Sequence, residues 1–364
     1  RIKTIHSCQI MSIHYILKFY FCIHNSKNQY FTYLLRKIKV LIQENKSSYK
    51  WIVLTVFTAV AGVSQMLWLN FAPLITQLME KYNKSEGTIS WLILVFPLLY
   101  VILSIPSGIM INKKGYKFTV GLGSIIIAFF SILRIFESNF YLLLIGQIGI
   151  AIGQPFVVNG ISKLVADWFH KDEHALATGL ATVGLFVGMA LGMGLTPALV
   201  DGDSLTKAMI VFAIISTVSC FLFLVFGKEN RKPSEQADNF TGLGEFVSMF
   251  KQKDLFLIFI MAFLALGYFN GLTTWLEPML FAQNISADHA GIAGAMLIVG
   301  GIFGSIIIPP ISDKIKRRKP ILMICCALGL ILTYPFCMNG NYSSLLVLGF
   351  ALGFLFLPGY ALLL

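Results

Sequence analysis

Ten long apolar segments dominate this sequence and constrain what it can fold into. Each has about 19 residues or more, enough for a helix to cross the ~30 Å hydrocarbon core of a bilayer. Together they cover most of the chain after Trp51. Only 12% of the residues are charged, about half of what a water-soluble domain carries. The sequence therefore predicts an all-α membrane protein and excludes a water-soluble enzyme.

The segments define the expected layout of the chain. We expect an N-terminal extension that is disordered or peripheral, a six-helix bundle, a polar connection and four further helices, at 1–50, 51–227, 228–254 and 255–364. The later part of the connection has apolar residues at helical spacing. It forms either an amphipathic helix on the membrane face or a plain tether. The expected spanning helices are 51–78, 88–111, 118–136, 140–166, 175–200, 207–227, 255–281, 290–311, 320–338 and 344–364.

Basic residues concentrate in alternate loops, for example at Lys113, Lys171, Arg231 and Arg317. Under the positive-inside rule these loops face the cytoplasm, which places the N-terminus there as well. The formal net charge of +11 is then balanced by anionic lipid head groups rather than by nucleic acid. We expect a multi-pass integral protein of the plasma membrane.

An internal repeat runs through the apolar region. Residues of the same kind recur about 200 positions apart in the pairs Pro73 and Pro278, Pro106 and Pro309, Asn112 and Asp313, Gly149 and Gly349, and Gly153 and Gly353. Equivalent loops fall on the same side of the membrane, so the two copies are parallel repeats about an axis along the membrane normal. On this reading a six-helix unit is duplicated, and the chain stops inside its tenth helix, about two helices short.

Two basic loops at equivalent positions of the repeat resemble the signature of the major facilitator transporters. The matching residues are Asn112, Lys113, Gly115 and Lys117 in the first copy, and Asp313, Lys314, Arg317 and Arg318 in the second. The resemblance implies that glycine lets helices pack closely, an acid caps the next helix, and the basic cluster locks a cytoplasmic gate. Asn112 replaces the usual acid, so only the second copy has that charge-assisted bond. Ordinary positive-inside loops are the alternative.

A further gate candidate follows the fourth segment. Asp167 lies one helical turn after Lys163 and directly before Trp168. Asp167 either pairs with a basic residue of the loop after the tenth helix or marks the water interface beside Trp168.

Two features are expected to serve structure. In the fifth segment Gly184, Gly188 and Gly192 recur every four residues and predict a groove that a neighbouring helix approaches closely. Arg134 is expected to extend its charged end to the outer surface.

Polar residues deep in the spans must find a partner or line a wet cavity. The candidates are Gln65, Trp68, Asn70, Gln147, Gln154, Asn159, Tyr268, Asn270, Thr273, Thr274, Trp275 and Glu277. From these we select Trp68, Asn70, Gln154, Asn270 and Thr274 as substrate-binding candidates. For any single Gln or Asn, the alternative is an interhelical hydrogen bond. Glu277 precedes Pro278, which predicts a helix break near solvent, and Glu277 serves either coupling or an outer gate.

Several stretches resemble the feline leukaemia virus subgroup C receptor-related family of facilitators and its prokaryotic relatives. They are Gly146-Gln147, Gln154-Pro155-Phe156-Val157, Ala166-Asp167-Trp168-Phe169, Trp68-Leu69-Asn70-Phe71 and Asn270 through Glu277. Animal members of the family carry choline, ethanolamine or related amines, and heme export has been attributed to some. The resemblance implies that Trp68 offers its indole face to an amine, a cation–π contact worth ~2 kcal/mol when desolvated, and that Gln154 bonds the hydroxyl end. The family's aromatic residue of the seventh helix is Asn270 here, which weakens an aromatic cage.

The resemblance implies a transporter of a small organic solute that works by alternating access. A cationic amine such as choline or ethanolamine is the first candidate, and proton-coupled carriage of organic anions or metabolites is the alternative. No span carries a cluster typical of catalysis, so we expect no enzyme. We expect no cofactor, no metal and no nucleic-acid partner, and a monomer whose partners are its substrate and the bilayer.

Overall fold

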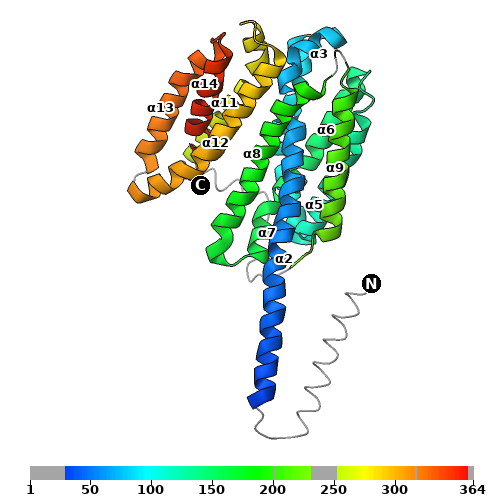
Figure 1. The fold of residues 1–364 in the computed structure, drawn as a ribbon, viewed down its shortest axis with the longest axis vertical. Coiled ribbons are helices and arrows are strands. Elements are labelled where there is room, and N and C mark those ends of the chain that lie inside the picture. Colours follow the sequence, from blue (N-terminus) through cyan, green and yellow to red (C-terminus); the bar gives the residue numbers. More distant parts are fainter. Residues whose placement is uncertain (1–28, 201, 203, 231–251, 316–317, 360–364) are drawn as a thin grey trace. The chain divides into compact units, whose positions relative to one another are not determined.

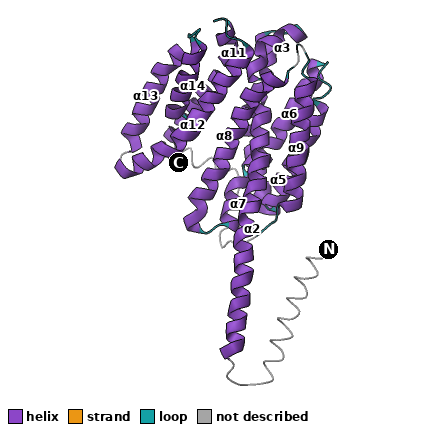
Figure 2. Cartoon of the chain, viewed as in Figure 1, coloured by secondary structure: helices purple, strands orange, loops and turns teal. Residues whose placement is uncertain are grey.

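The computed structural model describes residues 29–200, 202, 204–230, 252–315 and 318–359; for 29–47, 254, 313, 318 and 319 it describes the backbone alone. Contacts divide the chain into two units, 1–51 and 52–364. The described elements are helices joined by loops (Figure 2). The larger unit contains all the residues of the candidate site.

Figure 1 shows the helices, coloured and labelled in chain order. They are α2 (Gln29–Leu69), η1 (Ala72–Leu74), α3 (Ile75–Tyr82), α4 (Glu86–Lys114), α5 (Tyr116–Leu133), α6 (Phe140–Val158), α7 (Gly160–Trp168), η2 (Lys171–Glu173), α8 (His174–Leu199), α9 (Thr206–Phe226), α11 (Lys253–Phe281), α12 (Ala287–Ile315), α13 (Arg318–Cys337) and α14 (Tyr342–Phe356). α2 begins inside the segment expected as an extension.

Nine helical segments in the described part of the chain are long and apolar enough to cross a membrane. They match the first nine expected spans to within a few residues, which confirms the all-α membrane fold. The tenth expected span corresponds to α14, a helix of 15 residues, and residues 360–364 lie outside the description. Most of the connection, at 231–251, lies outside it as well.

A proline breaks the first expected helix. Pro73 lies in η1, after α2 has ended at Leu69. Proline lacks a backbone N–H, and its ring clashes with the carbonyl four residues earlier, which here belongs to Leu69. Its repeat counterpart, Pro278, lies inside the continuous helix α11, so the helix break predicted there is wrong.

The glycine groove of α8 receives α2. A Cβ atom on Gly188 would overlap the backbone of Gly62, and one on Gly62 would lie 2.8 Å from the carbonyl oxygen of Gly184. A Cβ atom on Gly192 would meet the backbone of Met66. The predicted close approach of a neighbouring helix is therefore confirmed.

Local structure repeats between the two halves. The side chain of Asn139 accepts a hydrogen bond from the N–H of Tyr141 (2.9 Å) at the start of α6. Asn341 does the same for Ser343 (3.0 Å) at the start of α14. Further along the same helices, Gly149 and Gly349 each pack against a phenylalanine ring of the preceding helix, Phe130 and Phe336 respectively. These matched contacts support the parallel repeat.

The halves pack against each other where α8 ends and α12 begins (Figure 1). A Cβ atom on Gly291 would lie 2.6 Å from the carbonyl oxygen of Met193 and 3.2 Å from Cβ of Pro73. We call this the α3 end of the unit, and the opposite end, where α4 finishes at Lys114, the basic end. The α3 end is thus a tightly packed junction between the halves.

Candidate functional site

An aromatic cluster lies where the two halves meet. The ring of Trp68 in α2 lies 6.4 Å from that of Phe96 in α4, at an interplanar angle of 26°. It lies 6.5 Å from the ring of Phe269 in α11, at 60°. Trp68 is 8% exposed, and its Nε1 has no hydrogen-bond partner among the described residues. A tryptophan of the first half thus contacts an aromatic ring of the second.

Two predicted residues of α11 lie beside this contact. Asn270 follows Phe269 directly, and Thr274 lies one helical turn further along. The Nδ2 atom of Asn270 donates to the carbonyl of Leu266 (2.8 Å). Its Oδ1 atom and the hydroxyl of Thr274 are buried, with no partner in the described part of the chain. Asn270 and Thr274 therefore lie on α11 close to Phe269 in the chain, while no described contact joins either of them to Trp68.

Gln154 lies elsewhere, inside the first half. It is seven residues after Gln147 and so shares its face of α6. Gln147 donates to the carbonyls of Leu67 (3.3 Å) and Leu92 (2.8 Å). Gln147 thus lies level with Leu67, the neighbour of Trp68. Seven residues of helix correspond to about 10 Å, so Gln154 lies about 10 Å further along α6 than Gln147. Its buried Nε2 has no partner among the described residues, and no described contact joins Gln154 to Trp68.

Asn70 faces a buried arginine instead of the aromatic cluster. Arg134 is fully buried and donates from Nη1 to Oε1 of Gln147 (2.5 Å) and to Oδ1 of Asn70 (3.5 Å). Its guanidinium carbon lies 5.3 Å from the centre of the Phe71 ring. The expectation that Arg134 reaches the outer surface is wrong, because two amide oxygens and a ring face hold it inside. Gly146 leaves room for it, since a Cβ there would lie 2.5 Å from the Cγ of Arg134.

Hydrogen bonds distinguish Gln147 and Asn159 from the five substrate-binding candidates. Gln147 bonds neighbouring helices as described, and Asn159 accepts from the hydroxyl of Tyr100 (2.7 Å) and donates to that of Ser107 (2.7 Å). For Gln147 and Asn159 the structure therefore agrees with the alternative expectation, a hydrogen bond between helices. Each of the five substrate-binding candidates retains one buried polar atom without a partner among the described residues, namely Trp68 Nε1, Asn70 Nδ2, Gln154 Nε2, Asn270 Oδ1 and Thr274 Oγ1. Unpaired buried groups are costly, by ~1–3 kcal/mol.

A carboxylate joins the halves at the α3 end. Glu277 is 2% exposed, and its Oε2 accepts hydrogen bonds from the backbone N–H (2.9 Å) and the hydroxyl (3.0 Å) of Thr76. Thr76 lies in the first turn of α3, where the helix dipole favours a negative charge. We call this pair the Thr76–Glu277 clamp. Thr76 did not figure in the sequence prediction, although its place just after Pro73 marks a helix start.

The first gate loop receives its carboxylate from outside the loop. Gly115 has φ of +91°, a left-handed conformation that suits glycine. Glu229, in the chain just after α9, accepts a hydrogen bond from the N–H of Lys117 (2.9 Å). A Cβ on Gly115 would lie 2.5 Å from Oε1 of that carboxylate. Asn112 and Lys113 are exposed. Glu229 thus places at the start of α5 the negative charge that Asn112 cannot supply, and the sequence prediction missed it.

The same stretch of chain is bonded to the fourth span. The hydroxyl of Tyr116 donates to the carbonyl of Lys228. Nε1 of Trp168 donates to the Tyr116 oxygen (2.7 Å) and to the Lys228 carbonyl (3.2 Å). Loop, span and the exit from α9 are therefore held together at the basic end.

Asp167 lies inside this arrangement. It is 2% exposed and pairs with Lys163 across one helical turn (2.9 Å). Its carbonyl accepts a hydrogen bond from Asn230 (2.8 Å). Asp167 is therefore buried among protein groups, and both interpretations of its role, as a partner of a basic residue and as a marker of the water interface, stay predictions.

The second gate loop is described only in part. Lys314 is exposed at the end of α12. The side chains of Asp313 and Arg318, and all of Arg317, lie outside the described residues. Their predicted role stays a prediction.

The fold and the buried polar groups define the class of the protein. Apolar helices long enough to cross a membrane form two halves, and unpaired polar groups lie where those halves meet. Among the described residues no group of three or more His, Cys, Asp or Glu is placed to hold a metal ion. The molecule is a polytopic helical membrane protein with buried polar groups inside an apolar core.

The chain belongs to the Major Facilitator Superfamily, whose family model matches residues 56–364. It is 26% identical over 339 residues to a choline/ethanolamine transporter, FLVCR2, of Rattus norvegicus, covering 86% of this chain and 62% of that protein. It is 24% identical over 321 residues to an uncharacterized MFS-type transporter of Caenorhabditis elegans, covering 82% of this chain and 53% of the relative. The chain thus spans little more than half the length of these relatives. The resemblance predicted from the helix motifs is confirmed.

A solved structure confirms the fold. A bacterial homologue of the human lysosomal transporter Spinster, in an inward-facing and unoccupied conformation, superposes with a TM-score of 0.68 at 18% identity. The match covers 86% of this chain and 75% of that one. The helices described above therefore adopt the major facilitator arrangement.

Proposed function

We propose that the protein transports a small organic solute across the membrane by alternating access, and that the solute is a cationic amine such as choline or ethanolamine. The observation that carries this proposal is the aromatic cluster of Trp68, Phe96 and Phe269, which spans the two halves beside unpaired polar atoms. A solute bound there contacts both halves at once. Such contact is what couples binding to a movement between them.

The chemistry of the cluster suits an organic cation. A quaternary or primary ammonium group placed over the indole of Trp68 gains a cation–π attraction of ~2 kcal/mol when desolvated. Phe269 supplies the aromatic ring of α11 that the substitution by Asn270 had put in doubt. Oδ1 of Asn270 and the hydroxyl of Thr274 have no partner among the described residues, and each can accept a hydrogen bond from an ammonium N–H or from the solute's hydroxyl. The name of the relative FLVCR2 supports the same class of solute.

Alternating access requires one end to be closed while the other opens. The Thr76–Glu277 clamp and the packing of Gly291 against Met193 support a state closed at the α3 end. We propose that rocking of the halves breaks these contacts and brings together the two gate loops at the basic end. In this scheme Gly115 and Lys117 belong to the gate loop of the first half, and Lys314 belongs to the gate loop of the second half.

Uptake into proteoliposomes tests the proposal. We expect radiolabelled choline or ethanolamine to accumulate with the purified protein, and Trp68→Ala and Asn270→Ala to lower the rate. Trp91→Ala is the matched control, because Trp91 is 48% exposed on α4 and lies outside the cluster. If both site variants transport as the unmodified protein does, the assignment of the site is lost.

A second candidate is proton-coupled carriage of organic anions or metabolites. It is favoured by Glu277, a buried carboxylate at the junction of the halves whose Oε1 has no partner in the described part of the chain. An imposed pH gradient should then drive flux, and Glu277→Gln should stop the gradient-driven part alone. Equal uptake with and without a gradient rejects this candidate and leaves the amine proposal standing.

We propose that the basic end faces the cytoplasm and that the protein is a monomer of the plasma membrane. The lysines of the basic end, including Lys113, Lys114 and Lys314, support this orientation. Labelling of single cysteines in intact cells tests it. A cysteine at Lys113 should react with a membrane-impermeant reagent only after permeabilisation, and one at Ser286, between α11 and α12, before it.

A further inference from the structure

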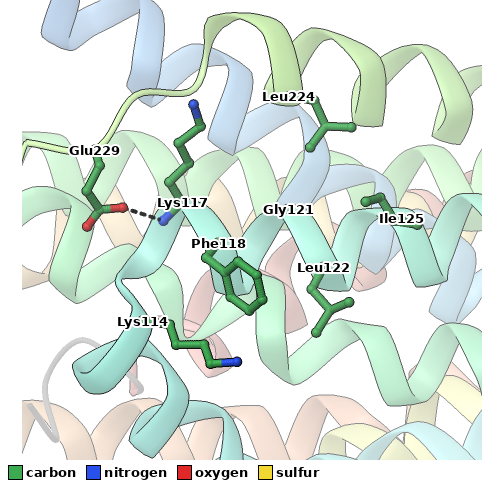
Figure 3. A pocket seen from close by; sticks show the side chains of 8 residues that line it. All are labelled: Lys114, Lys117, Phe118, Gly121, Leu122, Ile125, Leu224 and Glu229. Atoms are coloured by element: carbon green, nitrogen blue, oxygen red, sulfur yellow. Dashed lines mark hydrogen bonds between the residues drawn. The ribbon is translucent and has the colours of Figure 1, made fainter.

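A groove opens on the outside of the first half, between α5 and α9 near the basic end (Figure 3). Its volume is about 480 Å³. Figure 3 shows lysine and glutamate side chains at one end of the groove and apolar side chains along the rest. It shares no residue with the aromatic cluster, and Lys117, which the proposed transport cycle assigns to the gate, lies at its polar end.

The polar end carries a net positive charge. Lys114 is the last residue of α4, and its Nζ lies 4.8 Å from the centre of the Phe118 ring. Lys117 lies in the first turn of α5. The third charged group lining the groove is Glu229, whose carboxylate accepts from the N–H of Lys117 and is thus directed at the start of the helix. Two lysines against one carboxylate leave one positive charge for a ligand.

The remainder of the groove is an apolar track inside membrane-spanning segments. Phe118, Leu122 and Ile125 follow one face of α5, and Leu224 of α9 lines the other wall. From Phe118 to Ile125 the track runs about 10 Å along the helix, about two thirds of the ~15 Å depth of one leaflet's hydrocarbon. Gly121 keeps it open, because a Cβ there would lie 3.3 Å from Cδ2 of Leu224.

We propose that this groove binds one anionic phospholipid, with the head group at the end that carries Lys114 and Lys117 and an acyl chain along the track. Charge complementarity selects the head group, since the lining groups are positive overall. The depth of the track selects a long acyl chain over a soluble phosphate, which has nothing to place against Phe118, Leu122 and Ile125. The lipid would fasten the exit of α9 to the gate loop from the membrane side.

Native mass spectrometry of the purified protein, titrated with dioleoyl phosphatidylglycerol, tests the proposal. We expect one tightly held lipid per protein. Each lysine near an anionic surface contributes ~1 kcal/mol, or about fivefold in affinity. The double variant Lys114→Gln with Lys117→Gln should therefore lose roughly 25-fold, while Lys113→Gln, an exposed neighbour that does not line the groove, should bind as the unmodified protein does.

Three ligands separate the possible sources of affinity. Dioleoyl phosphatidylcholine and phosphatidylethanolamine, which carry no net charge, and glycerol 3-phosphate, which has no acyl chain, should all bind at least tenfold more weakly than phosphatidylglycerol. Equal binding of a neutral lipid, equal binding of glycerol 3-phosphate, or unchanged lipid binding in the double variant would each overturn the proposal.

Discussion

The Thr76–Glu277 clamp makes a quantitative prediction about the balance between the two states of the protein. Thr76→Val removes the hydroxyl donor to Oε2 of Glu277 (3.0 Å) and keeps the backbone N–H bond (2.9 Å). A hydrogen bond to a charged group contributes ~1.5–3 kcal/mol. The state closed at the α3 end should therefore lose about 13- to 160-fold in population relative to the state open there. Glu277→Ala removes both bonds and should shift the balance further.

Pulsed electron paramagnetic resonance measures that balance directly. Spin labels on cysteines at Ser85 and Ser286, both exposed and on opposite halves at the α3 end, report the separation of the halves there. The long-distance fraction should grow in Thr76→Val and in Glu277→Ala. Thr217→Val is the matched control, because that hydroxyl donates to the carbonyl of Ala213 in its own helix (2.7 Å) and bonds no other described residue. If the distance distributions of all variants coincide, the clamp does not hold the halves together.

Three further variants test the packing of the first half, each by thermal or denaturant unfolding in detergent. Gly188→Ala forces a Cβ into the backbone of Gly62 and should destabilise the protein by ~1–3 kcal/mol. Glu229→Gln removes the negative charge at the start of α5 and should cost ~0.3–1 kcal/mol. Gln147→Leu leaves Arg134 without its nearest acceptor and should cost ~1–3 kcal/mol.

Each of these variants has a control on the same chain. Gly179→Ala should be neutral or stabilising, because nothing lies within 4 Å of its added Cβ. Glu80→Gln is the control for Glu229→Gln, because Glu80 is exposed on α3. Gln65→Leu is the control for Gln147→Leu, because Oε1 of Gln65 is already unpaired within the described structure. Each control should lower the stability less than the variant it matches. If a control variant destabilises the protein as much as the test variant it matches, the type of substitution, and not the loss of the named contact, causes the destabilisation.

Hydropathy and residue spacing predicted the parts of the fold that depend on local sequence. Apolar length alone placed nine spans, and the spacing of Gly184, Gly188 and Gly192 predicted a close helix contact, because both signals are carried by residues within one helix. The break after Leu69 was not predicted, because the expected span ran unbroken from 51 to 78, although Pro73 acts on the carbonyl four residues earlier. The rule that proline breaks a helix gave a wrong prediction at Pro278, because α11 continues through that residue.

Contacts between distant segments could not be read from the sequence. Arg134 resembled a surface arginine, and only the packing of Asn70, Phe71 and Gln147 around it shows that it is buried. Glu229 replaces the acid missing at Asn112 from a position 117 residues further along the chain. Which residues of distant segments meet depends on how each helix is rotated about its own axis. That rotation is set by packing against neighbouring helices.

Binding of radiolabelled choline to the purified protein, followed by scintillation proximity, tests most directly whether the cluster around Trp68 receives a cationic solute. Loss of a desolvated cation–π contact of ~2 kcal/mol corresponds to about 30-fold in affinity. We predict that Trp68→Ala raises the dissociation constant for choline about 30-fold, while Trp91→Ala leaves it unchanged. Equal affinity of Trp68→Ala and the unmodified protein would contradict the account.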